Sequence, residues 1–544
     1  MDECRSCDCE PALLAKPRRS TSARILLIAV LAGVATRCLA FVLNLEIYFD
    51  AAYCVNSILV RDYQELLGPL DNFQIAPPLF SWIVKACIGL GTSDRLLRLL
   101  PLGAGLLSLL LFAVLCRQVL RGSAAWFALA ILSTSHVAIL ASMRAKPYST
   151  DLLVGVTFTL LAVRWLARPQ RAWPVIAMAI LAPIVVWLSY TSVFVIGGIG
   201  LVLAAWAVVH RRQICIRTGA AIAAIGVLAL ASFGALHVVN LRDAMSNAGT
   251  SGAMYDAWSA AFPPLESLPR TLWWLVKMHT GRLYSYPFGE NNFGSTLSFV
   301  CWCVGLVALY RRSRNAWLLA ILLAPQALLL AAAFAGKYPY GGHARISLFL
   351  APAMCLLIGA GIARLTGRLR YTGRRRCRTV LASLLVLSTI IGMVKVSLDA
   401  LATYRGPSIR TFITTISEQT PDNAPVFCLN TQRLIAGGGP ARQIFEYYMQ
   451  RILGERIRWA WDGQWPTPAD TSNLAKVTVI EFVSPGEPDP AAEATRQALQ
   501  ARYGEAFDPD HAQRCPILSR HPGEARFYEL PVEAEAPQAN NATP

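Results

Sequence analysis

Apolar residues along this chain gather in long runs, which short polar segments separate. A helix needs about 20 apolar residues to cross the roughly 30 Å core of a membrane. Runs near that length fall at 24–45, 96–116, 124–143, 149–167, 173–190, 191–209, 219–240, 294–310, 316–335, 346–363 and 379–397. The pattern predicts an all-α polytopic membrane protein with about eleven transmembrane helices.

The composition agrees with this pattern. The chain is 55% hydrophobic and 15% charged, with a mean hydropathy of +0.43, whereas charge makes up about a quarter of a soluble domain. The net charge of +17 on its own would suggest a nucleic-acid partner. The basic residues lie in short runs between apolar stretches, however, so no nucleic-acid partner is predicted.

The distribution of arginine predicts the orientation. Five of the connecting segments hold 18 arginines and no acidic residue, and they are 117–123, 164–172, 210–218, 311–315 and 364–378. Basic connecting loops stay in the cytoplasm, so an odd number of crossings places the N-terminus there and the C-terminus outside. The first apolar run is too long for a secretory signal, and residues 1–23 are expected to be a disordered cytoplasmic tail.

A transmembrane domain over 24–397 is predicted to carry two long outer loops, 46–95 and 241–293. The first loop reads as two amphipathic helices, the second of which starts at Pro77 and Pro78, where a missing amide donor costs little. That second helix is expected to lie in the membrane surface through its apolar residues, which are Leu79, Phe80, Trp82, Ile83 and Val84. The second loop is expected to form an interfacial aromatic belt of Trp258, Trp273, Trp274, Tyr284 and Tyr286.

The tail is predicted to form a small extracytoplasmic α/β domain over 398–531, followed by a disordered end at 532–544. "APVFCLN" and "VTVIEFV" have the pattern of buried strands, and "ARQIFEYYMQRIL" that of an amphipathic helix. Cys428 and Cys515 both fall in this domain, and a disulfide between them is one prediction for an oxidising compartment.

Polar residues that are suited to chemistry cluster at the predicted outer ends of the spans. Asp50 follows the first span, Asp71 and Gln74 lie in the first loop, and two compact turns carry the others, which are Arg144, Lys146, Tyr148 and Asp151, then Tyr338, His343 and Arg345. A carboxylate accepts a proton from an attacking hydroxyl, and basic side chains stabilise a departing phosphate. The set suits a substrate with a lipid tail, a phosphate and a polar head.

Structural roles are the alternative for each of these residues. Outer Lys and Arg side chains often anchor a protein at the headgroups, and Asp50 also suits the N-cap of the helix after it. Asp151 and Lys146 have the alternative of pairing with each other. Arg37, inside the first span, either snorkels or lines the same cavity, and the sequence leaves that choice open.

At these residues the sequence resembles the bacterial GT-C fold glycosyltransferases, which are related to protein O-mannosyltransferases and to the lipid A aminoarabinose transferase. Asp50 matches the first acid after span one, "QIAPPLFSWIVK" matches the loop helix, and "KPYSTDLL" and "YPYGGHARISLFLAP" are similar to later segments. The resemblance covers spans one to ten. It departs at Ala51, where the family often has Glu.

The resemblance implies a polyprenyl-phosphate sugar donor and an inverting displacement on the outer face of the membrane. Asp50 would be the catalytic base, and Lys146 and Arg345 would stabilise the lipid phosphate with Arg144 and Tyr338. Tyr148, His343, Asp71 and Gln74 complete the predicted substrate-binding set. No cofactor is assigned with certainty; whether a divalent cation takes part is left open, with Asp71 as a second oxygen ligand if it does.

The implied partners are the lipid-linked donor, membrane lipids and an envelope acceptor, either a lipid, a glycan or a protein. The composition favours a bacterial inner membrane with the active face toward the periplasm. Two other functions compete with this one. A transporter or flippase of a lipid-linked or anionic solute would also have many spans, and Ala51 gives weight to a catalytically inactive GT-C-like scaffold.

Overall fold

The computed structural model describes residues 21–44, 47–71, 74–91, 93–246, 258–286, 293–313, 316–402, 409–421, 424–429, 440–459, 476–483, 497, 500, 512–517 and 523–531. Nearly all of the predicted 1–23 tail and all of the 532–544 tail lie outside these residues. The chain divides into two compact units, one of Met1–Asn44 and Arg61–Val394, and the other of Leu45–Val60 and Lys395–Pro544.

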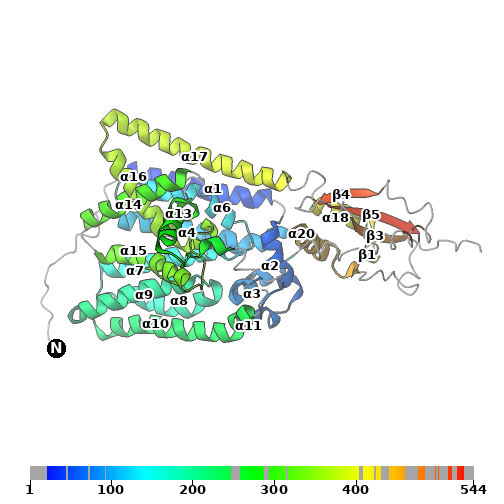
Figure 1. Ribbon diagram of the computed structural model, residues 1–544, viewed down its shortest axis with the longest axis horizontal. Helices are drawn as coiled ribbons and strands as arrows, with labels where there is room; N and C mark the ends of the chain where they lie inside the picture. The colour runs from blue at the N-terminus through cyan, green and yellow to red at the C-terminus, as the bar shows by residue number, and fades with distance from the viewer. Residues whose placement is uncertain are drawn as a thin grey trace, which may run out of the picture. The chain divides into compact units, whose positions relative to one another are not determined.

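The first unit is a bundle of apolar helices (Figure 1). Among the described residues, seven helices are long and apolar enough to cross a membrane. They are built on α1 (Thr21–Leu43), α4 (Leu99–Val119), α7 (Tyr148–Ala167), α9 (Ser192–Val209), α10 (Ile216–Leu236), α15 (Ala316–Phe334) and α16 (Ala351–Gly367). Short turns extend three of them, namely η2 (Asp94–Arg98) before α4, η4 (His237–Leu241) and α11 (Arg242–Ser246) after α10, and η7 (Ala344–Leu350) before α16. The chain is a multi-pass membrane protein.

The other four predicted spans are also helical. Three are single helices, α8 (Trp173–Leu188), α14 (Phe293–Ser313) and α17 (Tyr371–Ala402). The segment predicted as one span over 124–143 is helical but broken, because α5 (Ser123–Thr134) ends before Ser135 and α6 (His136–Ala141) starts anew. Twelve residues of α5 rise only about 18 Å, and the Ser135 hydroxyl accepts from the Ala138 amide to cap α6.

Helix α16 packs between α14 and α5. Two glycines allow α14 and α16 to touch backbone to backbone, since a Cβ on Gly305 would lie 1.8 Å from the Leu357 carbonyl oxygen and one on Gly361 would lie 1.8 Å from that of Cys301. Small residues permit this close approach of membrane helices. Helix α17, in contrast, exposes an apolar surface suited to lipid, formed by Val380, Leu384, Val386, Leu387, Ile390, Ile391 and Val394.

The two helices predicted in the first outer loop are present, and several residues predicted to face the membrane surface are buried. Helix α3 (Pro78–Ile88) begins at the predicted prolines, yet Phe80 is fully buried and Val84 nearly so. In the second loop, α13 (Leu268–Thr280) leaves Trp273 69% exposed. The aromatic-belt prediction is wrong for three members, because Trp274, Tyr284 and Tyr286 are buried in the first unit.

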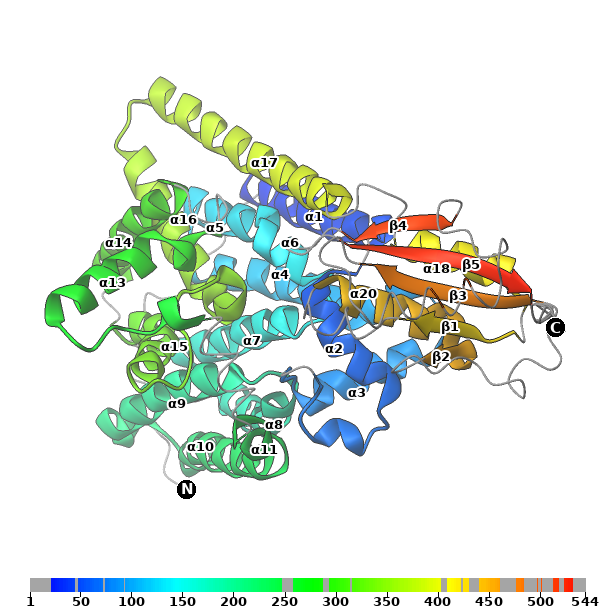
Figure 2. The same cartoon turned by 45° about the vertical axis from the view of Figure 1, so that its right-hand side comes forward.

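The C-terminal part of the second unit is the predicted α/β fold, with one five-stranded sheet in the order β2-β1-β3-β5-β4 (Figure 2). The strands are β1 (Val426–Leu429), β2 (Ile457–Trp459), β3 (Lys476–Val483), β4 (Gln513–Ile517) and β5 (Gly523–Pro531). Strand β1 runs parallel to β2 and β3, whereas β5 is antiparallel to β3 and β4. The helices among the described residues of this domain include α18 (Ile409–Gln419) and α20 (Pro440–Tyr448), which η8 (Met449–Leu453) continues.

The predicted disulfide in this domain is wrong. Cys428 lies in β1 and Cys515 in β4, three strands away in the sheet. Neighbouring strands are about 4.8 Å apart, so about 14 Å separates the two backbones, and a disulfide needs Cα atoms within about 7 Å. Cys428 is a free, buried thiol.

Candidate functional site

The turn between α6 and α7 holds Lys146 in a fixed position. The Lys146 amide donates to the Arg144 carbonyl at 2.8 Å, which closes a tight turn. The Ser149 hydroxyl donates to the Ala141 carbonyl at 2.9 Å and joins the two helix ends. Lys146 is only 6% exposed, and its Nζ donates to Oε1 of Gln74 at 2.8 Å. This contact orients the ammonium group without neutralising it, which suits a site for an anion.

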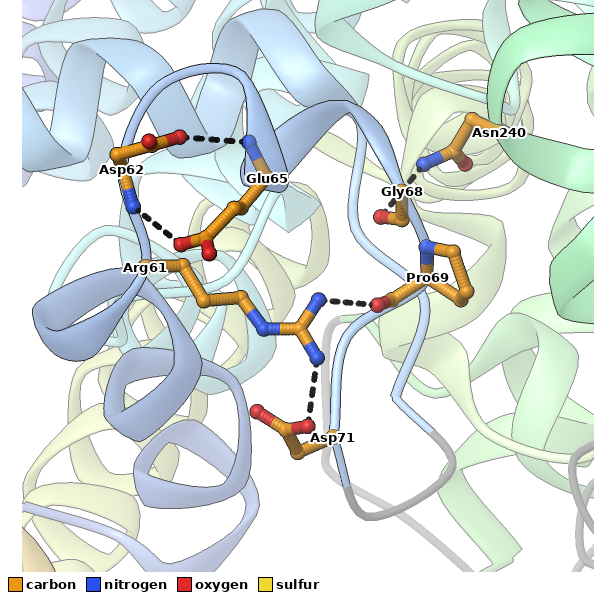
Figure 3. A network of polar contacts seen from close by, with 7 residues as sticks. All are labelled: Arg61, Asp62, Glu65, Gly68, Pro69, Asp71 and Asn240. Carbon is orange, nitrogen blue, oxygen red and sulfur yellow. Dashed lines mark hydrogen bonds and ion pairs between the residues drawn. The ribbon is translucent and has the colours of Figure 1, made fainter.

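The loop that carries Gln74 is fastened at several points (Figure 3). Arg61 forms an ion pair of 2.6 Å with Asp71 and also donates to the Pro69 carbonyl. Asn240, beyond α10, donates to the Leu67 and Gly68 carbonyls. In addition, the Tyr190 hydroxyl lies 2.7 Å from the Ala76 carbonyl and 2.6 Å from Asn240 Oδ1. Gln74 is therefore presented by a loop that side chains of the bundle hold in place.

Residues at the start of η1 (Glu65–Leu67) fold this loop locally. Asp62 Oδ1 accepts from the Glu65 amide at 2.7 Å, and Glu65 Oε2 accepts from the Asp62 amide at 2.9 Å (Figure 3). This reciprocal arrangement satisfies two amide donors at a helix start. Asp71 pairs with Arg61, so the side chain that the sequence analysis offers as a cation ligand has a guanidinium partner, and it is 56% exposed.

Arg345 lies among aromatic side chains. Its guanidinium carbon is 5.8 Å from the ring centroid of Tyr148 and 6.0 Å from that of Trp258. Both distances fall within the range of cation–π attraction. A guanidinium is planar, stacks on aromatic faces and presents a fork of N–H donors that matches two oxygens of a phosphate or a carboxylate. Arg345 and Tyr148, which both belong to the predicted substrate-binding set, are thus brought together.

His343 is hydrogen-bonded to Arg282, which is not among the predicted site residues. Arg282 Nη1 donates to the Gly342 carbonyl at 3.0 Å and lies 3.1 Å from His343 Nε2. Because a guanidinium only donates, Nε2 of His343 is the acceptor here. The His343 ring also contacts Trp258 edge to face at 5.2 Å. His343 therefore anchors Arg282 and Trp258 next to Arg345.

Tyr338 and Asp151 complete this side of the site. The Tyr338 hydroxyl donates to the Ile346 carbonyl at 3.1 Å. Burial raises the pKa of Tyr338 well above its usual range, and the nearby Asp151 raises it further, so this hydroxyl stays protonated. Asp151 accepts a hydrogen bond of 2.6 Å from Ser189, and Lys146 donates one to Gln74. The hydrogen bonds of Asp151 and Lys146 thus go to different partner residues. Arg144 is half-buried on the same turn.

Arg37 neither snorkels nor faces water; it is 1% exposed and bonds to a broken helix end. Its Nη1 donates to the carbonyls of Gly33 and Ser133, and its Nη2 to that of Leu132, over 2.9–3.3 Å. The last carbonyls of a helix lack helical donors and attract a cation. Because α5 ends at Thr134, Arg37 stabilises this end inside the bundle.

Asp50 is the second residue of α2 (Phe49–Val60) and belongs to the second unit. It is half-buried, and the neighbouring Ala51 is 2% exposed. A carboxylate at position 51 would thus be buried, and an unpaired buried carboxylate is costly. In the described parts of the chain, no group of three or more His, Cys, Asp or Glu side chains is placed to hold a metal ion.

The structure thus brings several predicted residues together in the first unit, with Gln74 on Lys146 and Tyr148 against Arg345. It also adds Arg282 and Asn240, for which the sequence gives no local signal. Trp258, predicted as a membrane anchor, contacts the site instead. Tyr190 and Asn240 are far from Gln74 in sequence, and both donate hydrogen bonds to main-chain carbonyls of the loop that carries it.

Comparison with known proteins defines the fold. No family model matches the sequence, and no curated protein matches it. Among solved structures, ArnT from Cupriavidus metallidurans bound to undecaprenyl phosphate is similar with a TM-score of 0.52 and 12% identity, over 95% of this chain and 99% of that one. ArnT from the same organism in the apo state has a TM-score of 0.52 and 10% identity, over 93% and 98%. The chain has the fold of the GT-C membrane glycosyltransferases, and the sequence resemblance is confirmed at that level.

Proposed function

We propose that this protein transfers a sugar from a polyprenyl-phosphate donor to an envelope acceptor, with inversion at the anomeric carbon. The observation that carries the proposal is a fold shared over nearly the whole of both chains with ArnT, a protein whose structure holds undecaprenyl phosphate. The buried ammonium group of Lys146, oriented by Gln74 at one end of the bundle, supplies the chemistry that such a phosphate needs.

On the donor side, the bond between the anomeric carbon and the phosphate oxygen breaks, and the phosphate leaves with both electrons. Lys146 and Arg345 stabilise the negative charge that develops on it, which is the largest contribution in many transfer reactions. Tyr338, kept protonated by burial, and Arg144 add donors on the same side. Since a lipid phosphate is a good leaving group, no acid catalyst is required.

On the acceptor side, an acceptor hydroxyl oxygen forms the new bond to the anomeric carbon from the opposite face, and its proton passes to the Asp50 carboxylate. A carboxylate is a suitable general base when it lies within hydrogen-bond reach of that hydroxyl. The acceptor belongs to one of three classes, a lipid, a glycan or a protein of the envelope.

The reaction is proposed to take place on the periplasmic face of the inner membrane. Supporting this, contacts connect segments that the charge pattern assigns to the same side, as Gln74 with Lys146, Asn240 with Leu67, and Trp258 with Arg345. The arginine-rich connections would then face the cytoplasm, and the α/β domain the periplasm.

Sugar transfer by the purified protein in reconstituted vesicles tests the proposal. Vesicles would be supplied with a panel of labelled polyprenyl-phosphate sugars and extracted envelope lipids, glycans and proteins. Label that moves to one acceptor with the opposite anomeric configuration would support it. A protein that moves the donor across the vesicle membrane and transfers no label would instead support the transporter hypothesis.

A further inference from the structure

The segment that carries Asp50 folds with the far end of the chain. Residues Leu45–Val60 form a compact unit with Lys395–Pro544, although the sequence on either side of this segment belongs to the other unit. Helix α2 packs along α20 of the α/β domain, and Figure 2 shows the two helices side by side.

Two polar contacts fasten the segment at its two ends. Before α2, the Ile47 amide donates to the Tyr448 hydroxyl at 3.1 Å. Within α2, Asn56 Nδ2 donates to the main-chain oxygen of Gln443 at 3.0 Å and to its Oε1 at 2.9 Å. Asn56 is 4% exposed and Gln443 is 2% exposed. Buried hydrogen bonds such as those of the Asn56 Nδ2 atom favour one packing arrangement, because other arrangements leave the donor without an acceptor.

The partner residues are themselves held within the α/β domain. Arg410 of α18 donates to the Tyr448 hydroxyl at 3.1 Å, and its guanidinium lies 5.4 Å from the centre of the Tyr448 ring. Phe412 of α18 meets Phe445 of α20 edge to face at 6.3 Å. Contacts with α18 therefore fix the position of the Tyr448 hydroxyl, which also accepts the hydrogen bond from the Ile47 amide.

Asp50 lies between the two fastening points, three residues after Ile47 and six before Asn56. Since a helix is rigid over this length, fixing both ends fixes the first turn of α2. We propose that the α/β domain positions the base of the reaction, with Gln443 and Tyr448 as the positioning residues for Asp50. This inference rests on the proposed function. Catalytic groups lose about 100-fold in rate when misplaced by about 1 Å, which is why such fastening matters.

The test uses the full-length protein with Gln443→Leu and Tyr448→Phe, which keep the side-chain bulk. Gln443→Leu removes the side-chain acceptor of Asn56 and leaves the main-chain one, and Tyr448→Phe removes the hydroxyl that accepts from the Ile47 amide. Glu418→Gln, an exposed change on α18, is the control in the same domain. Two measurements are made on each, namely hydrogen–deuterium exchange of the peptide that covers 47–60, and sugar-transfer kinetics in vesicles. Binding of undecaprenyl phosphate is measured as the donor-side probe.

The inference predicts faster exchange over 47–60 and a kcat about tenfold lower in both variants. The affinity for undecaprenyl phosphate and the KM for the donor would change less than twofold, which general unfolding would not allow. The control would match the wild type in every measurement. Restoring a hydrogen-bonding side chain with Gln443→Asn would recover part of kcat.

Three results would overturn the inference. In the first, exchange over 47–60 stays as slow in both variants as in the wild type, so the contacts do not hold α2. In the second, exchange rises while kcat is unchanged, so the position of α2 does not affect the reaction. In the third, kcat and phosphate binding fall together, which indicates general destabilisation. A wild-type protein that transfers no sugar is a different failure, because it contradicts the proposed function itself.

Discussion

Lys146 donates a hydrogen bond of 2.8 Å from Nζ to Oε1 of Gln74, which lies 72 residues earlier in the chain. The bond links the turn before α7 to a loop that Arg61, Asn240 and Tyr190 hold in place. In the proposed reaction, this ammonium group is the donor that meets a phosphate oxygen of the lipid.

The first prediction concerns this pair. Lys146→Ala should slow transfer by about 10- to 100-fold, because a charge-assisted hydrogen bond contributes about 1.5–3 kcal/mol and each 1.36 kcal/mol is tenfold in rate. Gln74→Leu should have a smaller effect, at most about tenfold, since it removes the orientation and keeps the charge. Initial rates in vesicles measure both. The exposed Lys337 is the matched control, and an equal loss in Lys337→Ala would mean that only the surface charge matters.

The second prediction concerns the stacking of Arg345. Arg345→Lys keeps the charge but loses the planar group that lies over Tyr148 and Trp258. It should weaken donor binding by about three- to tenfold, since an arginine–aromatic contact contributes about 0.5–2 kcal/mol. Titration with undecaprenyl phosphate measures the change. Tyr148→Phe retains the ring and should bind like the wild type, whereas an unchanged affinity in Arg345→Lys would contradict a role for stacking.

The third prediction concerns Arg37. Arg37→Met should lower the melting temperature by several degrees, because the carbonyls of Leu132 and Ser133 lose their Arg37 donors and a buried acceptor left without a partner costs about 1–3 kcal/mol. Thermal unfolding in detergent measures it. The neighbouring Thr36→Ala removes only a local bond to Gly33 and should change little. Arg37→Met with the melting temperature of the wild type would show that the end of α5 needs no buried cation.

The fourth prediction concerns pH. His279 Nδ1 lies 2.8 Å from the Leu275 carbonyl, which only accepts, so this nitrogen donates and Nε2 accepts from Tyr340 at 3.2 Å. Burial lowers the pKa of His279 below its usual value of 6.5. The unfolded chain then binds the proton more readily than the folded one, so stability is greatest above about pH 6.5 and falls as the pH drops below it.

Melting temperatures measured from pH 8 to pH 5 should therefore decrease, and His279→Gln should decrease less steeply over the same range. A variant whose pH dependence equals that of the wild type would show that another group is responsible. Tyr340→Phe is a second variant, since it removes the hydroxyl that donates to the neutral ring.

Much of the fold follows from the sequence because membrane helices are encoded locally. A run of about 20 apolar residues has few alternatives in a bilayer, and all eleven predicted segments are helical in the structure. Hydropathy alone does not predict the break at Ser135, although "STSH" interrupts the run and hydroxyl side chains compete with helical hydrogen bonds at such places. The strands β1 and β3 were also predictable from their short apolar runs.

Pairings between distant residues have no such local signal. Asn56 meets Gln443 across 387 residues, so a loop prediction over 46–95 assigns α2 to the wrong compact unit. The binding partners of Lys146 and His343 depend in the same way on how helices pack. Residue types at the predicted outer ends of spans identify candidates such as Lys146 and Arg345, while Arg282, Asn240 and the role of Arg37 emerge only from the three-dimensional contacts.

The central claim is that the chain transfers sugar with Asp50 as the base, and transfer by Asp50→Asn tests it most directly. Wild type, Asp50→Asn and the control Glu418→Gln would be compared in vesicles at equal, folded amounts, with binding of undecaprenyl phosphate measured in parallel. The account predicts that Asp50→Asn binds the lipid phosphate like the wild type and loses at least about 100-fold in transfer, within the range of a general base. Full transfer by Asp50→Asn would contradict the account.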